Sequence, residues 1–160
     1  MKSKDMTTLV GLTLAVGFVT LTLSPTTAKA ESASSARNGQ LHLTKDCSEY
    51  TGAAGDHCTI ISSDLDRIAI GSKIFYDQAA GTPTGLLDSN VVLDGGSGNR
   101  AVGRCTLDLG TGIGLCTFSD GTGRFSGFQA RLDVTCGAGS SCRVDGTYKF
   151  GSVSEQENDR

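Results

Sequence analysis

Six cysteines are the side chains of this sequence with the widest chemical scope. A cysteine can bind zinc, act as a nucleophile beside a histidine, or pair with another cysteine as a disulfide. No two of the cysteines form a C-x-x-C unit, so we expect no metal site. His57 precedes Cys58, but neighbours on a strand point to opposite faces, which argues against a cysteine nucleophile. We therefore expect the cysteines to form disulfides; they are Cys47, Cys58, Cys105, Cys116, Cys136 and Cys142.

Other catalytic patterns are not found in the sequence. His42 and His57 are the two histidines that could act as a base, and no G-x-S-x-G motif supplies a serine nucleophile. The glycine clusters at 95–99 and 110–114 lack the repetition or the spacing of calcium and phosphate loops, and we interpret them as turns. We therefore expect no cofactor, and we assign no catalytic residue.

The first thirty residues have the organisation of a secretion signal. Lys2 and Lys4 precede an apolar run over residues 6–23, and Ala28-Lys29-Ala30 is a small-x-small cleavage site. We predict a signal peptide over 1–30 and a secreted, extracellular or periplasmic, mature chain without stable membrane insertion. The alternative is an uncleaved anchor, because the apolar run is just long enough to span a bilayer.

The charge of the chain is negative. It is −3 for the full sequence, and it becomes more negative on cleavage, because the signal holds three lysines and one aspartate. This balance argues against nucleic acid as a partner. The sequence leaves open whether the protein forms a homo-oligomer.

The composition is that of an all-β protein, with 22 glycines among short β-branched and aromatic segments and no tryptophan. We expect one domain over 41–150, between disordered ends at 31–40 and 151–160. Alternating apolar residues predict strands at 128–135 and 143–150. Further strands are expected at 59–62, 73–78, 86–93 and 99–108. Short strands joined by glycine turns indicate a sandwich or a closed barrel.

Pairing neighbouring cysteines gives consistent hairpins. With Cys136 opposite Cys142, Leu132 faces Gly146 and Val134 faces Val144, so that apolar residues share one face. With Cys105 opposite Cys116, the same construction places a two-residue turn at residues 110–111. Pairing Cys47 with Cys58 closes a polar loop. Six cysteines allow fifteen pairings, and this one stays a hypothesis.

One segment carries a family resemblance. Residues 70–76, followed later by residues 116–127 and in particular by Gly121-Thr122-Gly123-Arg124-Phe125-Ser126-Gly127, resemble the allene oxide cyclase and dirigent-like barrel family. The resemblance implies an antiparallel barrel of about eight strands that binds a small hydrophobic molecule and steers its cyclisation or coupling by shape. The chain departs from the family at Phe128, where a large ring stands in place of a small residue and would narrow the cavity if it points inward.

The candidate ligand contacts are four aromatic residues expected on the inner face: Tyr76, Phe128, Tyr148 and Phe150. The alternative is that these rings are packed core. Arg104 or Asp108 could add an interior charge, because the inward face of that strand is ambiguous. Three functions remain open: a cyclase-like or dirigent-like barrel, a non-catalytic module that binds a small apolar ligand, and a module that recognises another protein.

Overall fold

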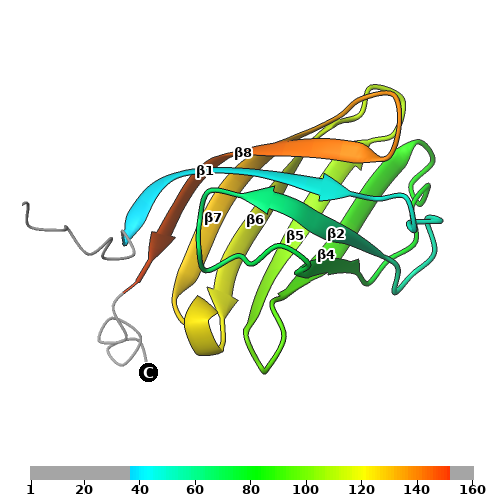
Figure 1. The fold of residues 1–160 in the computed structure, drawn as a ribbon. Coiled ribbons are helices and arrows are strands. Elements are labelled where there is room, and N and C mark those ends of the chain that lie inside the picture. Colours follow the sequence, from blue (N-terminus) through cyan, green and yellow to red (C-terminus); the bar gives the residue numbers. More distant parts are fainter. Residues whose placement is uncertain (1–36, 152–160) are drawn as a thin grey trace, which may run out of the picture. The chain divides into compact units, whose positions relative to one another are not determined.

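The computed structural model describes residues 37–151, which form a closed barrel of eight antiparallel strands (Figure 1). Each strand pairs with the next, and β8 pairs back with β1. This confirms the expected fold class, a small antiparallel barrel stapled by disulfides. The elements are β1 (Asn38–Asp46), β2 (His57–Ser63), β3 (Lys73–Tyr76), β4 (Leu86–Asp94), β5 (Arg100–Asp108), β6 (Ile113–Gly121), the 3-10 helix η1 (Gly123–Phe125), β7 (Phe128–Cys136) and β8 (Ser141–Phe150).

The predicted signal peptide at 1–30 lies outside the described residues, as do residues 31–36 and 152–160 of the predicted disordered ends. Within the described part of the chain, no helix is long and apolar enough to cross a membrane.

The strand that closes the barrel, β1, is the one that was not predicted. It begins at Asn38, so residues 38–40 belong to the barrel and not to a disordered linker. Nine residue pairs join it to β8, from Asn38 opposite Lys149 to Asp46 opposite Ser141. The first residues of β1 are polar and exposed, and this concealed the strand in the sequence. The backbone ladder to β8 holds them in place regardless of their side chains.

The three predicted disulfides are present: Cys47–Cys58, Cys105–Cys116 and Cys136–Cys142. The predicted registers are also present. Leu132 lies opposite Gly146 and Val134 opposite Val144 in the β7–β8 ladder. A Cβ added at Gly146 would lie 2.1 Å from the backbone oxygen of Arg131, so this position has room for glycine alone.

The turn between β5 and β6 is wider than the predicted two-residue turn at 110–111. It spans residues 109–112, and the glycine with a positive φ, 69°, is Gly112 and not Gly110. The Asp108 carboxylate explains the difference, because it accepts hydrogen bonds from the backbone N–H groups of Gly110 and Thr111 and so stabilises the longer turn.

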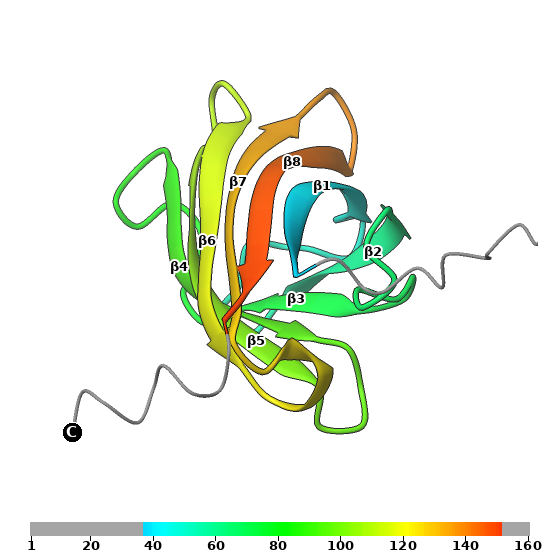
Figure 2. The same cartoon turned by 90° about the vertical axis from the view of Figure 1, so that its left-hand side faces the viewer.

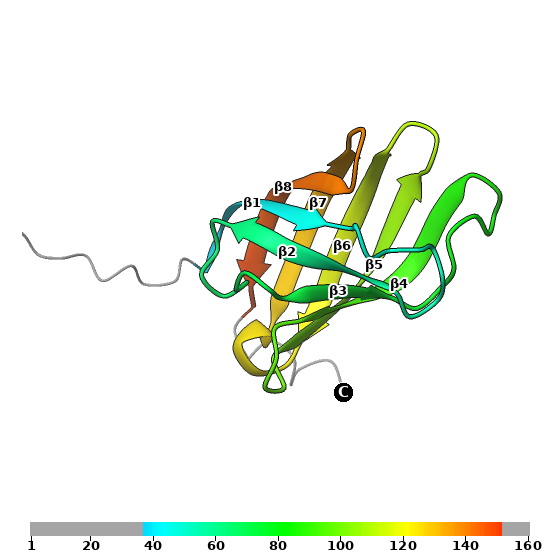
Figure 3. The ribbon, with the colours of Figure 1, turned by 45° about the vertical axis from the view of Figure 1, so that its right-hand side comes forward.

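Because the strands run alternately up and down, alternate loops lie at the same end of the barrel. The β5–β6 and β7–β8 turns lie together at one end, and η1 and the β4–β5 loop lie at the other (Figure 2). The β1–β2 and β3–β4 connections, at 47–56 and 77–85, belong to the first end, here called the loop end (Figure 3).

The opposite end is filled by aromatic rings. Phe128 is fully buried, and its ring centroid lies between 5.2 and 6.5 Å from those of four other rings. Phe125, on η1, is fully buried as well, so the glycine-rich segment 121–127 folds a ring back over the barrel. The aromatic cluster consists of Phe118, Phe125, Phe128, Tyr148 and Phe150.

Candidate functional site

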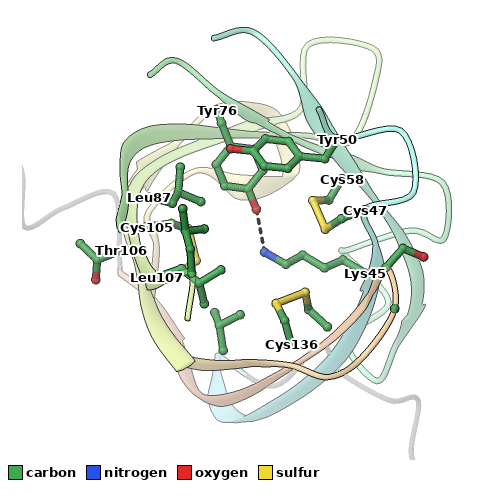
Figure 4. Close-up of a pocket in the computed structure, with 16 residues that line it drawn as sticks. Lys45, Cys47, Tyr50, Cys58, Tyr76, Leu87, Cys105, Thr106, Leu107 and Cys136 are labelled. Carbon is green, nitrogen blue, oxygen red and sulfur yellow. Dashed lines mark hydrogen bonds between the residues drawn. A yellow bond between two sulfur atoms is a disulfide. The ribbon is translucent and has the colours of Figure 1, made fainter. Parts of the chain in front are cut away.

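A pocket opens at the loop end of the barrel. Its volume is about 240 Å³, and its walls are the three disulfides together with apolar side chains that include Leu87, Leu107 and Val134 (Figure 4). Deeper in the barrel, between Leu43 and Phe128, a void of about 10 Å³ remains, which is hardly room for one water molecule. The pocket is therefore a cup with one opening and not a channel.

Three other hollows have larger volumes, from about 370 to 420 Å³, but they are shallow depressions on the outer wall. Their linings include outward-facing polar residues such as Arg131, Arg104 and Lys73. A small ligand is better held where it can lose most of its contact with water, and this favours the pocket at the loop end.

The side chain that distinguishes this pocket is Lys45. It is 4% exposed, and its Nζ lies inside the barrel and donates a hydrogen bond of 2.6 Å to Tyr76 Oη (Figure 4). Among residues 37–151, no carboxylate oxygen lies within 4.0 Å of this ammonium, so its charge has no counterion in the described protein. A buried cation of this kind is costly to keep, and this makes Lys45 a candidate functional residue.

The alternation of β1 directs Lys45 inward. Leu41 and Leu43 are buried in the core, and Lys45 follows on the same face, while His42 and Thr44 point outward. Lys45 is not among the site residues predicted from the sequence. The signal was nevertheless present in the sequence, because Leu41, Leu43, Lys45 and Cys47 alternate with polar residues and so place a lysine where a core residue belongs.

Tyr76 and Tyr50 form the aromatic wall beside Lys45. Tyr76 ends β3 and is 1% exposed, and its ring centroid lies 5.1 Å from that of Tyr50 in the β1–β2 loop. Burial raises the pKa of the Tyr50 hydroxyl, and the nearby Tyr76 and Asp56 raise it further. Tyr50 Oη is buried and has no hydrogen-bond partner among the described residues. It is therefore a second polar group that faces a largely apolar surrounding.

Carboxylates near the loop end are engaged in shaping the loops. Asp56 accepts hydrogen bonds from the hydroxyl and the N–H of Thr51, which lower the pKa of its carboxyl. The pKa of Asp46 is lowered chiefly by the hydroxyl of Ser140. The hydrogen bonds that Asp108 accepts in the β5–β6 turn lower its pKa too, those from Thr111 most. These acids stay ionised, and they bond to loop donors instead of to Lys45.

The rim of the pocket is partly apolar. Leu109 lines the pocket and is 44% exposed, and its N–H donates to the oxygen of Gly85, beside Leu86. An apolar molecule can therefore make contact at the rim before it enters.

The structure separates the four predicted ligand contacts. Tyr76 lines the pocket, whereas Phe128, Tyr148 and Phe150 belong to the aromatic cluster at the opposite end. Phe150 is only partly buried there, and the Arg67 guanidinium lies 4.3 Å from its ring centroid. The four residues thus do not form one site.

The two charged residues considered for the interior of β5 both lie outside it. Ala101 and Cys105 are the buried residues of this strand, so Arg104 points outward, where its Nη2 lies 2.7 Å from Asp88 Oδ2. Asp108 is exposed at the end of the strand and caps the turn. The interior charge comes instead from Lys45, on another strand.

The two histidines lie apart from the pocket lining. His42 is exposed, with Nδ1 2.7 Å from Asp145 Oδ1. His57 packs against Phe75, and its Nε2 lies 3.3 Å from Glu49 Oε2. Within residues 37–151, no three His, Cys, Asp or Glu side chains are grouped so that they could hold a metal ion.

No protein-family model, no curated protein and no solved structure matches this chain. The resemblance to the allene oxide cyclase and dirigent-like family therefore stays a prediction from the sequence, and the pocket itself carries the functional argument.

Proposed function

We propose that this protein is a secreted binding protein that takes a small, mainly apolar molecule into the loop end of its barrel. The observation that carries the proposal is the pocket of about 240 Å³, in which apolar walls surround a buried Lys45–Tyr76 pair. The walls favour an apolar body, and the pair can orient one polar group, which is how small-molecule sites combine affinity with specificity.

The size and stiffness of the pocket support binding without rearrangement. Typical sites for drug-sized ligands occupy roughly 300–1,000 Å³, so this pocket suits a smaller molecule. All three disulfides line it, and they tie β1 to β2, β5 to β6 and β7 to β8 near the opening. Covalent ties of this kind reduce the conformational entropy that binding would otherwise cost.

The disulfides also indicate the compartment. Three intramolecular disulfides are typical of proteins in an oxidising environment, and within the described residues no cysteine is free. Secretion, to the extracellular space or the periplasm, is the proposal that agrees with this environment and with the signal-like sequence at 1–30.

A second candidate function is guidance of a cyclisation or coupling reaction, as the family resemblance implies. The observation that favours it is that Lys45 Nζ and Tyr76 Oη are hydrogen-bonded inside the pocket, where they could hold or move a proton beside a bound molecule. A shaped cavity that holds a reactive intermediate in one conformer could select the product without further catalytic groups.

The test is binding of neutral apolar probes to the disulfide-intact protein. We expect 1-hexanol and benzyl alcohol to bind, as measured by ligand-observed NMR, and native mass spectrometry of the freshly secreted protein to show a co-purified small molecule. Leu107→Trp should fill the pocket and weaken probe binding by at least about tenfold, since a ligand that no longer fits loses its buried contacts.

The matched control is Val102→Trp. Val102 lies on the same strand as Leu107 but on its outer face, where it is 47% exposed. It should leave probe binding unchanged. Equal binding by the wild type and by Leu107→Trp would place the probe outside the pocket and contradict the proposal. If neither probe binds the wild type, the alternative of a protein-recognition module takes its place.

A further inference from the structure

We propose that the pocket is built for a small carboxylic acid, bound head-first with its carboxylate on Lys45 and Tyr76; this inference rests on the proposed function. Lys45 Nζ occupies the interior of the barrel between the Cys47–Cys58 and Cys136–Cys142 disulfides, with Tyr76 opposite it (Figure 4). A group that reaches the bottom of the cup meets these two side chains together.

The hydrogen-bonding groups at the bottom of the pocket are donors. An ammonium has three N–H donors and no acceptor, and one of the three is used on Tyr76 Oη. Because this oxygen accepts from Lys45, the hydroxyl hydrogen of Tyr76 points elsewhere, and Tyr76 Oη donates no hydrogen bond to another residue among 37–151. The pair therefore presents two N–H groups and one O–H to an incoming ligand.

The chemistry of the ligand group follows from this set of donors. A carboxylate is acceptor-only, with two oxygens that can together receive all three hydrogen bonds. An amine or ammonium ligand would bring further donors and a like charge. A carboxylate also supplies the negative charge that the described protein does not place within 4.0 Å of Lys45. Binding thus compensates a buried charge that is otherwise unpaired.

The acids at the loop end leave this role open. Asp46 is on β1 next to Lys45, but it points to the opposite face and bonds to Ser48 and Ser140. Asp56 and Asp108 are held by loop N–H groups in the same way. These three side chains are therefore already engaged and do not serve as the counterion of Lys45, which a ligand can supply.

The volume limits the size of the acid. The pocket corresponds to about eight liquid-water volumes, so it holds a molecule on the order of ten non-hydrogen atoms. Benzoate and hexanoate have this size, whereas a long-chain acid would leave most of its chain outside the rim. The remaining lining is apolar and suits an aromatic ring or a short alkyl chain.

The experiment compares isosteric ligands on the wild-type, disulfide-intact protein, by calorimetric titration at constant pH. Benzoate should bind about 10- to 100-fold more tightly than benzamide, because hydrogen bonds to a charged group are worth more than those to a neutral one. Benzylamine should bind least. This comparison needs no variant, so it remains decisive even if a substitution at the site impairs folding.

Two variants assign the effect to the pair. Lys45→Met should remove at least about nine-tenths of the affinity for benzoate and leave that for benzyl alcohol within about threefold, since the apolar walls are kept. Tyr76→Phe should show a smaller loss with the same selectivity. The matched control is Lys149→Met, a lysine that β8 exposes on the outer face, and it should change neither affinity.

The outcomes separate the inference from the proposed function. If benzyl alcohol and benzamide bind as tightly as benzoate, the pocket takes apolar ligands but the inference is wrong. If no ligand of the series binds, the proposed function fails as well. If benzoate binds equally to Lys45→Met, its site lies elsewhere and the inference is wrong. A last outcome would also overturn the inference. If benzoate does not bind, but borohydride traps benzaldehyde as a covalent adduct on Lys45, the role of Lys45 is imine formation and not carboxylate binding.

Discussion

The hydrogen bond between Lys45 and Tyr76 should be visible as an energetic coupling in the unfolding of the protein. The Nζ–Oη distance is 2.6 Å, and both side chains are almost fully buried. A hydrogen bond to a charged group contributes about 1.5–3 kcal/mol to stability. Tyr76→Phe leaves the buried ammonium without this acceptor, and we expect it to lower the free energy of unfolding by about 2 kcal/mol.

Lys45→Met should behave differently. It loses the same hydrogen bond but also removes a buried charge, and such exchanges for an apolar side chain of similar volume are often neutral or stabilising. We expect the free energy of unfolding to stay within about 1 kcal/mol of the wild-type value. In this background Tyr76→Phe should cost almost nothing, so the double-mutant cycle should give a coupling energy of about 2 kcal/mol.

The assay is urea unfolding of the disulfide-intact protein, monitored by circular dichroism. The slope of the free energy of unfolding against urea concentration is compared between variants, because an equal slope shows that the difference is one of stability. Tyr50→Phe is the matched control. Tyr50 Oη is buried and has no partner in the described residues, so its removal takes away no hydrogen bond, and stability should stay unchanged or rise, by up to about 1–3 kcal/mol, but not fall. If the two substitutions at Lys45 and Tyr76 are additive within about 0.5 kcal/mol, the pair is not coupled and the argument from an unpaired charge fails.

Three further predictions concern the scaffold. Replacing both cysteines of the β7–β8 disulfide, which are six residues apart, with alanine should lower the free energy of unfolding by about 2 kcal/mol in urea titrations, and an unchanged midpoint would contradict the loop-entropy argument. Gly146→Ala forces a Cβ to 2.1 Å from a backbone oxygen and should lower the free energy of unfolding by about 1–3 kcal/mol or prevent folding. In the control Gly137→Ala the added Cβ meets no atom within 4 Å, and stability should be nearly unchanged. Equal urea midpoints for the two variants would refute the close approach at Gly146. The pKa of the Asp56 carboxyl is lowered in the folded state, so the stabilising contribution of this group is present above its ordinary pKa of 3.8 and is lost as the pH falls below that value. Asp56→Asn should therefore lower stability at neutral pH and make the stability fall less steeply with acid. An unchanged acid dependence would contradict this.

The sequence predicts the scaffold well where two independent signals agree. In β7 and β8, strict alternation of apolar residues and the spacing of Cys136 and Cys142 both indicate one register, and a slip by one residue would expose every apolar side chain. The predicted length of the β5–β6 turn was wrong, because the spacing of the cysteines fixes the register of the two strands but not the conformation of the turn. There the Asp108 side chain selects the longer loop.

The candidate site was harder to predict because its central residue is of a type that is rarely buried. Lys45 stands on the inward face of β1, but a lysine at the end of a polar segment is normally taken as exposed. Phe128, Tyr148 and Phe150 were selected as inward-facing aromatic residues, and periodicity cannot tell which end of a barrel a ring will fill. That depends on η1, which folds Phe125 against Phe128 and completes the cluster.

The aromatic cluster closes one end of the barrel, so the pocket is accessible from the loop end alone. A guest must leave by the route through which it arrived, and whichever part enters first ends up at the bottom, beside Lys45 and Tyr76. Its trailing part then faces the exit, between Leu109 and the β7–β8 turn. Ligands can therefore differ from one another in the part that faces the exit, but not in the part that lies beside Lys45 and Tyr76.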